Sequence, residues 1–343
     1  MTPFQWGRVD PQSGGLAPDF AALLDKGVKS GEFANLHGVL VARKGKIEAE
    51  RYFEGKDERW GTDLGTVAFN ESTLHDVRSV SKSVVGLLYG IALKEGKVPV
   101  LETPVLDVFP AYPDLARDER RRAIRLSHVL TMTMGLEWNE DVPYSDERNS
   151  EIAMERSKDR YRYVLERPIV AAPGERWRYS GGATALLGHL IAKGTGMPLL
   201  DYAREKLFSP MGIEKAEWTH GLNGEAAAAS GLRMRAPDLA RIGQLLLQRG
   251  EWDGRQVVAK DWISDTLTPR ADAFDGLRYG YQWYLVPRRD GSLAYMAIGL
   301  GGQRLVVIPS LELVYVIFMG NYYRQDQLKP LFAVQNLIHA SLR

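Results

Sequence analysis

The stretch SVSKSVVGLLYGIALKE, residues 79–95, carries the strongest helical pattern in the chain. Its apolar side chains recur at i, i+3 and i+4 spacing, and Gly96 follows as a stop signal. Ser79 stands at the predicted start, where free backbone N–H groups and the positive end of the helix dipole favour a developing anion. Lys82 lies three residues later, so the two side chains share one face. The segment predicts a helix whose first turn presents a hydroxyl beside an amine.

In the pattern S-x-x-K, a serine hydroxyl can act as a nucleophile that the lysine activates. The rest of this helix is apolar, and desolvation favours the neutral amine that can accept a proton. An N-cap serine followed by a solvated lysine has the same letters, and roughly one such match is expected by chance in a chain of this length. On this stretch alone, both interpretations stay open.

Strands are predicted on both sides of this helical region. Residues 37–42 and 47–52 form two strands joined by a turn at Gly45, and the second strand alternates apolar and charged residues, so one of its faces should meet water. Short turns with Gly or Pro separate four further predicted strands, at residues 279–286, 292–298, 303–308 and 311–319.

Helices are predicted before, between and after these strands, at residues 20–28, 126–134, 182–193, 198–207, 237–248 and 326–342. The fold class is therefore α+β, with one antiparallel sheet built from N- and C-terminal strands, flanking helices and an inserted helical lobe. We expect a single domain, because no repeat and no long polar linker divides the chain. Residues 1–78 and 225–343 would form the sheet lobe, and residues 79–224 the mainly helical lobe.

Composition and charge exclude several classes of function. Lys and Arg number 44 against 43 Asp and Glu among 343 residues, so the formal net charge is +1 and no electrostatic argument favours nucleic acid or an anionic membrane. The chain has no cysteine, which removes disulfides and thiolate nucleophiles. No two of the six histidines have i+3 or i+4 spacing, so we expect neither a metal site nor a cofactor; they are His37, His75, His128, His189, His220 and His339.

Residues 1–14 contain no basic stretch followed by an apolar run, which argues against a signal peptide. The longest apolar runs are too short for a membrane span. We expect a cytoplasmic protein, although a mature chain whose leader had been removed would look similar.

Two further stretches could carry chemistry. WRYSGG, residues 177–182, precedes a predicted helix, and the phenol of Tyr179 could shuttle a proton beside a lysine or simply pack. In MAIGLGGQ, residues 296–303, three glycines allow the backbone to approach a ligand closely, but an ordinary hairpin would have the same composition.

Taken together, the chain resembles the superfamily of serine β-lactamases and penicillin-binding proteins, especially its class C branch. The resemblance covers most of the chain in the same order and spacing. It rests on DVRSVSKS (76–83), LSHVLTMTMGL (126–136), PGERWRYS (173–180), SGLRM (230–234) and PDLARIG (237–243).

This resemblance implies specific roles. Ser79 would be the acylated nucleophile and Lys82 its activator. Tyr179 would be the proton shuttle of the family's second motif, which falls at residues 179–181 in this chain. The backbone N–H groups of Ser79 and Leu300 would form an oxyanion hole, with the strand that carries Gly299 as its second wall. Which of Lys82 and Tyr179 is the base for acylation stays open.

Two departures from the family pattern concern the substrate. Gly181 stands where β-lactamases carry the asparagine of the second motif, and Ala297–Ile298–Gly299 stands where relatives carry K-T-G or H-x-G, so the cation that meets a substrate carboxylate is missing. This third motif, and the loop 138–156, resemble the 6-aminohexanoate-dimer hydrolase group, whose members cleave linear amides of nylon oligomers and small esters. The expected substrate-binding residues are Tyr144, Gly181, Ile298 and Gly299.

The sequence thus predicts a serine hydrolase that cleaves a small-molecule amide or ester through an acyl-serine intermediate, without metal or cofactor. Three alternatives remain: a carboxylesterase with no amidase role, a β-lactamase or DD-peptidase-like penicillin-binding protein, and a catalytically silent relative that binds a ligand in the same cleft. The oligomeric state does not follow from the sequence.

Overall fold

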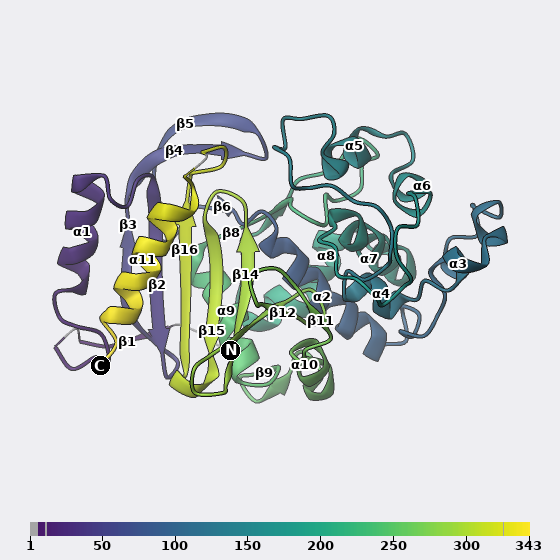
Figure 1. Cartoon of the computed structure of the whole chain (residues 1–343). Helices are drawn as coiled ribbons and strands as arrows, with labels where there is room; N and C mark the ends of the chain where they lie inside the picture. Colours follow the sequence, from purple (N-terminus) through teal and green to yellow (C-terminus); the bar gives the residue numbers. More distant parts are fainter. Residues whose placement is uncertain (1–5, 11, 325) are drawn as a thin grey trace.

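The computed structural model describes residues 6–10, 12–324 and 326–343, so part of the stretch considered for a leader, residues 1–5 and 11, lies outside the described residues. A nine-stranded sheet occupies one side of the molecule and a group of helices the other (Figure 1). The strand order is β1-β3-β2-β16-β15-β14-β13-β12-β11, and all neighbours are antiparallel except β1 and β3. This confirms the predicted α+β class and its mainly antiparallel sheet.

The sheet joins the two ends of the chain, because β2 pairs with β16 from Arg43↔Leu313 to Gly38↔Phe318. Its strands are β1 (Gly7–Arg8), β2 (Leu36–Arg43), β3 (Lys46–Tyr52), β11 (Ala271–Asp272), β12 (Arg278–Tyr279), β13 (Tyr284–Pro287), β14 (Leu293–Gly299), β15 (Gln303–Ile308) and β16 (Leu313–Met319).

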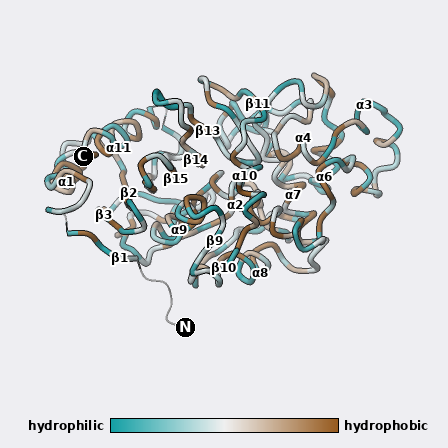
Figure 2. Tube along the Cα trace, turned by 90° about the horizontal axis from the view of Figure 1, so that it is seen from below, coloured by the Kyte–Doolittle hydropathy of each residue, from teal (hydrophilic) through white to brown (hydrophobic). Residues whose placement is uncertain are grey.

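Helices cover both faces of the central strands, and this explains their continuous apolar sequences. Val39 and Val41 of β2 pack with α1 (Phe20–Ser30) and α11 (Leu328–Ala340), whereas Leu40 of the same strand belongs to the core that includes α9 (Ala236–Leu247). Figure 2 shows hydrophobic residues along α9, inside the molecule.

Helix α2 (Val80–Lys94) lies between the sheet and the other helices and is buried from Val80 to Ala92. It packs against α7 (Gly181–Thr195), α10 (Lys260–Thr266) and β14. A Cβ at Gly90 would overlap the indole ring of Trp262, whose Nε1 donates a hydrogen bond to Gly86 O at 3.1 Å. These contacts hold the helix that begins at Ser79 in a fixed position.

Three predicted elements differ from those observed. The helix predicted over 126–134 is α4 (Leu126–Leu130), because Met132 is left-handed with φ 57°. The strand predicted over 279–286 is split into β12 and β13, since Gln282 is left-handed with φ 63° and its amide donates to Leu130 O at 3.0 Å. The helix predicted over 198–207 is α8 (Leu199–Ala203), followed by a π-helical turn, Arg204–Phe208.

The sequence analysis missed a hairpin formed by β4 (Glu54–Arg59) and β5 (Thr62–Ala68), which arches over one end of the sheet (Figure 1). Most β5 side chains are exposed, so this strand has no apolar alternation. Also missed were the short elements α3 (Glu119–Arg122), α5 (Ser150–Arg156), α6 (Arg160–Leu165), α10, β6 (His75–Asp76), β7 (Glu217–Trp218), β8 (Leu232–Met234), β9 (Glu251–Trp252), β10 (Arg255–Gln256) and the 3₁₀ turns Val105–Val108, Leu115–Arg117, Ser209–Met211 and Pro309–Leu311.

Among the helices in the described part of the chain, none combines the length and apolar character that a membrane span requires.

Candidate active site

The first turn of α2 brings a hydroxyl and an amine together. Lys82 Nζ donates a hydrogen bond to Ser79 Oγ at 2.9 Å. Ser79 is the N-cap residue, but its side chain makes no capping hydrogen bond, and Lys82 is only 2% exposed. A capping serine followed by a solvated lysine is therefore not what this sequence forms.

The backbone just before Ser79 turns sharply. Arg78 has φ 51°, a left-handed conformation that is uncommon for a residue other than glycine and that often occurs at functional sites. Its guanidinium is held by ion pairs with Glu58 and, at 3.6 Å, with Asp76, and it lies 4.8 Å from the ring centre of Tyr322. These contacts stabilise the strained residue, and the turn directs Ser79 toward a cavity.

Lys82 is enclosed by groups that accept hydrogen bonds or attract cations. Its Nζ donates to Ala229 O at 3.1 Å, lies 3.9 Å from Glu151 Oε2 and lies 4.7 Å from the ring centre of Tyr179. The amine is thus fixed on three sides while its fourth contact is the Ser79 hydroxyl.

Tyr179 approaches Ser79 from the loop that leads into α7, whose N-terminus is capped by the neighbouring Ser180 side chain. The phenol lies beside Ser79 and Lys82, whose Nζ is 4.7 Å from the ring centre. Burial raises the pKa of Tyr179 well above its usual value, the charge of Glu140 adds to the rise, and the neighbouring Ser79 side chain opposes it. The phenol is therefore protonated near neutral pH.

Two carboxylates that the sequence analysis did not identify stand behind these residues. Glu140 Oε1 accepts hydrogen bonds from Gly181 N and from Trp138 Nε1, both at 2.6 Å, and its Oε2 accepts one from Tyr144 OH at 2.7 Å. Burial raises the pKa of Glu140 to about 7; the charge of Glu151 adds to the rise and that of Lys82 opposes it.

Glu151 lies in the first turn of α5 and is 2% exposed. Its Oε1 accepts a hydrogen bond from Ser230 Oγ at 2.6 Å, whereas Oε2, the oxygen nearest Lys82, has no hydrogen-bond partner among the described residues. Asn149 caps this helix by accepting hydrogen bonds from two backbone N–H groups. The N-cap asparagine followed by a helical pattern was the signal in the sequence that could have located α5.

The two carboxylates explain why residue 181 is glycine. A Cβ at Gly181 would lie 2.7 Å from Glu151 Oε2 and 3.0 Å from Glu140 Oε1. The space that an asparagine side chain of the second motif would need is therefore filled by Glu140 and Glu151.

The edge of β14 packs against the segment before Ser79, since a Cβ at Gly299 would overlap Val77 O. Among the described residues, the backbone N–H groups of Ser79 and Leu300 donate no hydrogen bond. Both residues line a cavity of about 250 Å³, together with Trp60, Gly61, Arg78, Tyr144, Ser145, Glu151, Ile152, Ser230 and Tyr323.

The structure thus gathers most of the predicted site residues. Ser79, Tyr144 and Leu300 line the cavity. Lys82, Tyr179 and Gly181 lie next to residues of its wall, and Gly299 directly precedes Leu300 in the chain. Ile298 is half-buried and lies opposite Arg304 of β15 in the register; it is not among the described residues that line the cavity.

Two arginines near the motifs differ in their surroundings. Arg304 is buried, its Nη1 donates to Gln303 O at 2.8 Å, and burial lowers its pKa to about 10. Its charge acts on Tyr179 and opposes the rise in that residue's pKa. Arg178 is exposed and lies 3.3 Å from Asp141. Of the two, only Arg304 belongs to the buried surroundings of the site.

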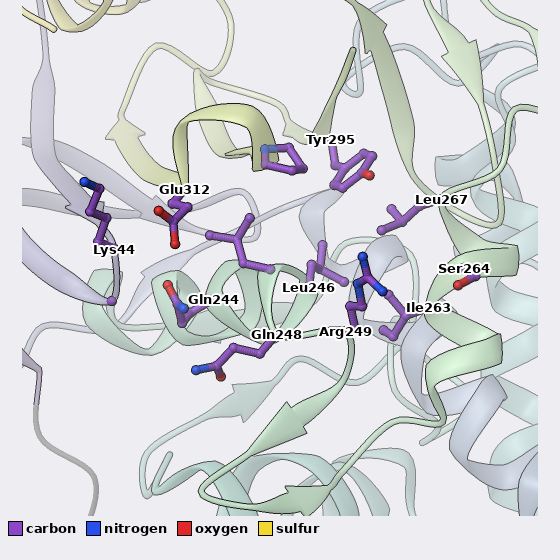
Figure 3. Close-up of a pocket in the computed structure, with 13 residues that line it drawn as sticks. Lys44, Gln244, Leu246, Gln248, Arg249, Ile263, Ser264, Leu267, Tyr295 and Glu312 are labelled. Atoms are coloured by element: carbon purple, nitrogen blue, oxygen red, sulfur yellow. The ribbon is translucent and has the colours of Figure 1, made fainter. Parts of the chain in front are cut away.

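A larger cavity, of about 800 Å³, lies elsewhere, between the β2–β3 turn, the end of α9 and α10 (Figure 3). Its one lining serine, Ser264, donates to the backbone oxygen of Lys260 at 3.2 Å. Because no amine in the described part of the chain is hydrogen-bonded to that hydroxyl, the serine–lysine chemistry points to the smaller cavity.

Residues 20–334 match the protein family described as Beta-lactamase. The chain belongs to this family. The predicted resemblance is confirmed, and so is the prediction of a β-lactamase-related hydrolase.

The relatives agree with this assignment. The chain is 25% identical over 299 residues to the 6-aminohexanoate-dimer hydrolase of Paenarthrobacter ureafaciens, covering 81% of this chain and 70% of that protein. A solved structure from Bacillus anthracis, provisionally named a 6-aminohexanoate-dimer hydrolase, has a TM-score of 0.74 at 21% identity and covers 98% of this chain and 88% of its own. A class C beta-lactamase has a TM-score of 0.68 at 18% identity, with 95% and 96% covered. The two structures share the fold of this chain.

Proposed function

We propose that this protein hydrolyses an amide or ester bond through an acyl-Ser79 intermediate. The observation that carries the proposal is the 2.9 Å contact between Lys82 Nζ and Ser79 Oγ, at a hydroxyl that also meets the phenol of Tyr179. A nucleophile within hydrogen-bond reach of a base, itself held by further groups, is the arrangement that covalent acyl transfer requires.

In the proposed acylation step, Ser79 Oγ attacks the carbonyl carbon and Lys82 accepts the hydroxyl proton. The raised pKa of Tyr179 favours a protonated phenol, so we assign to it the proton that the leaving amine or alkoxide receives. The proton on Lys82 then passes to Tyr179, which restores both residues. Water attacks the acyl-enzyme, its hydroxyl forms the released acid, and its other proton returns to Ser79 Oγ. Lys82 is accordingly the base for acylation.

The backbone N–H groups of Ser79 and Leu300 are the proposed oxyanion hole. Neither donates a hydrogen bond among the described residues, and both border the cavity. Donors that are already in place lower the energy of a tetrahedral oxyanion without reorganisation at the moment of reaction.

The proposed substrate is a linear amide or small ester with no carboxylate beside the third motif. Ala297 and Ile298 of that motif supply no cation, and the cavity wall includes the Glu151 carboxylate. The relative from Paenarthrobacter, named for a linear amide, supports the same substrate class. Desolvating a substrate carboxylate without a partner would cost about 10²-fold or more in kcat/KM.

The test compares kcat/KM for p-nitrophenyl butyrate, 6-aminohexanoate dimer and nitrocefin. We expect the ester or the linear amide to exceed nitrocefin by about 10²-fold. If nitrocefin were the best of the three, the protein would be a β-lactamase. If the protein turned over none of the three substrates but still bound the dimer, the result would support a catalytically silent relative that only binds a ligand.

A further inference from the structure

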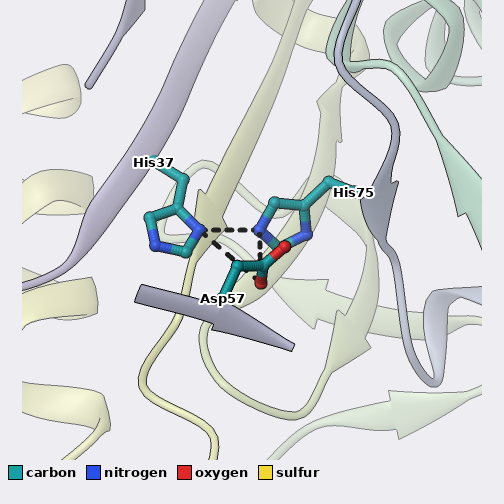
Figure 4. A group of neighbouring side chains, drawn as sticks. All are labelled: His37, Asp57 and His75. Carbon is teal, nitrogen blue, oxygen red and sulfur yellow. Dashed lines mark hydrogen bonds and ion pairs between the residues drawn. The ribbon is translucent and has the colours of Figure 1, made fainter. Parts of the chain in front are cut away.

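Three buried side chains from three different strands meet beside the sheet: His37 of β2, Asp57 of β4 and His75 of β6 (Figure 4). Both histidines are fully buried and Asp57 is 4% exposed. His37 Nδ1 lies 2.8 Å from His75 Nε2, and Asp57 Oδ1 lies 4.0 Å from the first nitrogen and 3.7 Å from the second.

The nitrogen of each ring that points away from the other ring, His37 Nε2 and His75 Nδ1, faces an oxygen atom, which assigns a hydrogen to it. The amide of Asn35 is oriented by Lys56, because its Nδ2 donates to Lys56 O and its Oδ1 accepts from Lys56 N, each at 3.0 Å. His37 Nε2 lies 3.2 Å from that Oδ1 and therefore donates to it. His75 Nδ1 lies 2.9 Å from the carbonyl oxygen of Asp76 and donates likewise.

A neutral imidazole carries one N–H, so the two nitrogens that face each other are both bare. With these tautomers, two lone pairs and a carboxylate oxygen converge, and a cation at their centre would offset their repulsion.

We propose that His37, Asp57 and His75 bind a divalent transition-metal ion, and that the ion is Zn²⁺. Three atoms with the separations given above share one point that lies about 2.1 Å from each, which is the Zn–N and Zn–O distance in proteins. Two imidazoles and a carboxylate suit zinc among the common ions. A proton shared between the two rings is the alternative, and the zinc content of the purified chain distinguishes the two.

The groups around the cluster match those that orient metal ligands. Each histidine donates its outer N–H to an oxygen, and Asp57 Oδ1 accepts a hydrogen bond from Tyr322 OH at 2.9 Å. Phe69 stacks on His37 with ring centres 4.1 Å apart, and Phe318 stacks on His75 at 4.6 Å. The rings are therefore fixed in the orientation that turns their bare nitrogens inward.

Two glycines leave room for the His37 ring. A Cβ at Gly55 would lie 2.6 Å from the ring, and a Cβ at Gly320 would lie 2.5 Å from it. Asp57 also lines a surface cavity of about 350 Å³, through which an ion could reach the cluster.

The ion would connect β2, the β4–β5 hairpin and β6. Its ligand in β6, His75, precedes Ser79 by four residues. Its role is therefore structural. The sequence did not indicate the site, because its ligands are far apart in the chain and meet only in the folded protein.

The test uses the purified full chain, before and after dialysis against a chelator, with zinc measured by mass spectrometry and thermal unfolding recorded. We expect one equivalent of zinc per chain before dialysis. Returning Zn²⁺ alone to the dialysed chain should raise Tm by about 5 °C at a hundredfold excess over Kd. Asp57→Asn and His75→Gln should lose the zinc, whereas His220→Gln, which alters an exposed histidine, should keep it.

A dialysed wild-type chain whose Tm does not respond to Zn²⁺ would overturn the proposal, and so would zinc retained by both ligand variants. If the variants do not fold, the titration of the wild-type chain decides alone. None of these measurements depends on enzymatic turnover, so the proposed hydrolase activity can fail or succeed independently.

Discussion

Two buried polar clusters lie on either side of the short segment 75–79, and they are built for different purposes. Around Ser79, its hydroxyl is hydrogen-bonded to an amine and lies beside a phenol, next to a cavity. Around His75, two rings and a carboxylate are fixed by backbone and side-chain oxygens. In our proposals, the first cluster moves protons to a bound molecule, whereas the second holds an ion. Burial of polar groups alone therefore does not identify an active site; access and exchangeable protons do.

Substitutions in the first cluster should affect turnover most. Lys82→Ala and Tyr179→Phe should each lower kcat by roughly 10²–10⁴, the usual range for losing a general acid or base. Steady-state kinetics on a p-nitrophenyl ester and on a linear amide would measure this. If Tyr179→Phe retained kcat within a few-fold, Tyr179 would be a packing residue and the comparison would rest on Ser79 and Lys82 alone.

Substitution in the second cluster should have the opposite profile. Asp57→Asn should lower Tm by about 5 °C in the presence of zinc while kcat at 25 °C stays within about threefold of wild type. The asparagine can still accept the hydrogen bond from Tyr322, so the loss reports the ion. A large loss of kcat with an unchanged Tm would contradict the proposal that the second cluster has a structural role and the first a catalytic one.

The glycine of the second motif offers a steric test. Gly181→Asn should cost about 1–3 kcal/mol of unfolding free energy, because the new side chain would meet Glu151 and Glu140. Gly196→Asn is the matched control: Gly196 is a left-handed C-cap with φ 70° and nothing near its Cβ, a position where asparagine is tolerated. Urea denaturation of both variants would compare them, and equal costs would mean that the carboxylates yield easily.

The smallest effect concerns pH. The folded protein raises the pKa of Glu140 to about 7 from 4.5, so between these values the folded state binds more protons than the unfolded state. The contribution of Glu140 to stability therefore declines as pH rises from about 4.5 to 7. Glu140→Gln should make the free energy of unfolding depend less on pH in this range. Glu155→Gln should have the same effect, because burial raises the pKa of Glu155 to about 7 as well. Urea denaturation from pH 5 to 8 would detect this; unchanged slopes in both variants would contradict it.

Long elements buried on one or both faces could be predicted from the sequence. The expected strands at 303–308 and 311–319 and the helix at 79–95 agree with β15, β16 and α2 to within about two residues, because continuous burial produces a strong apolar pattern. The β4–β5 hairpin could not be predicted from the sequence, because its exposed, charged strands carry no apolar pattern.

The site divides in the same way. Ser79, Lys82 and Tyr179 stand in motifs with fixed spacing, so the sequence could nominate them. Glu140 and Glu151 belong to a loop and a short helix, and their approach to Lys82 depends on tertiary packing. Residues that act together only after folding leave no periodic signal in the chain.

The central claim is that Ser79 forms a covalent acyl intermediate, and an electrophilic phosphonate tests it most directly. Intact-mass analysis and peptide mapping should show one added phosphonyl group, on Ser79, and loss of turnover in proportion to labelling. Ser145→Ala, which alters another serine of the same cavity, should label as fast as wild type, and Ser79→Ala should not label. A label on a different serine, or no label on an active enzyme, would contradict the account.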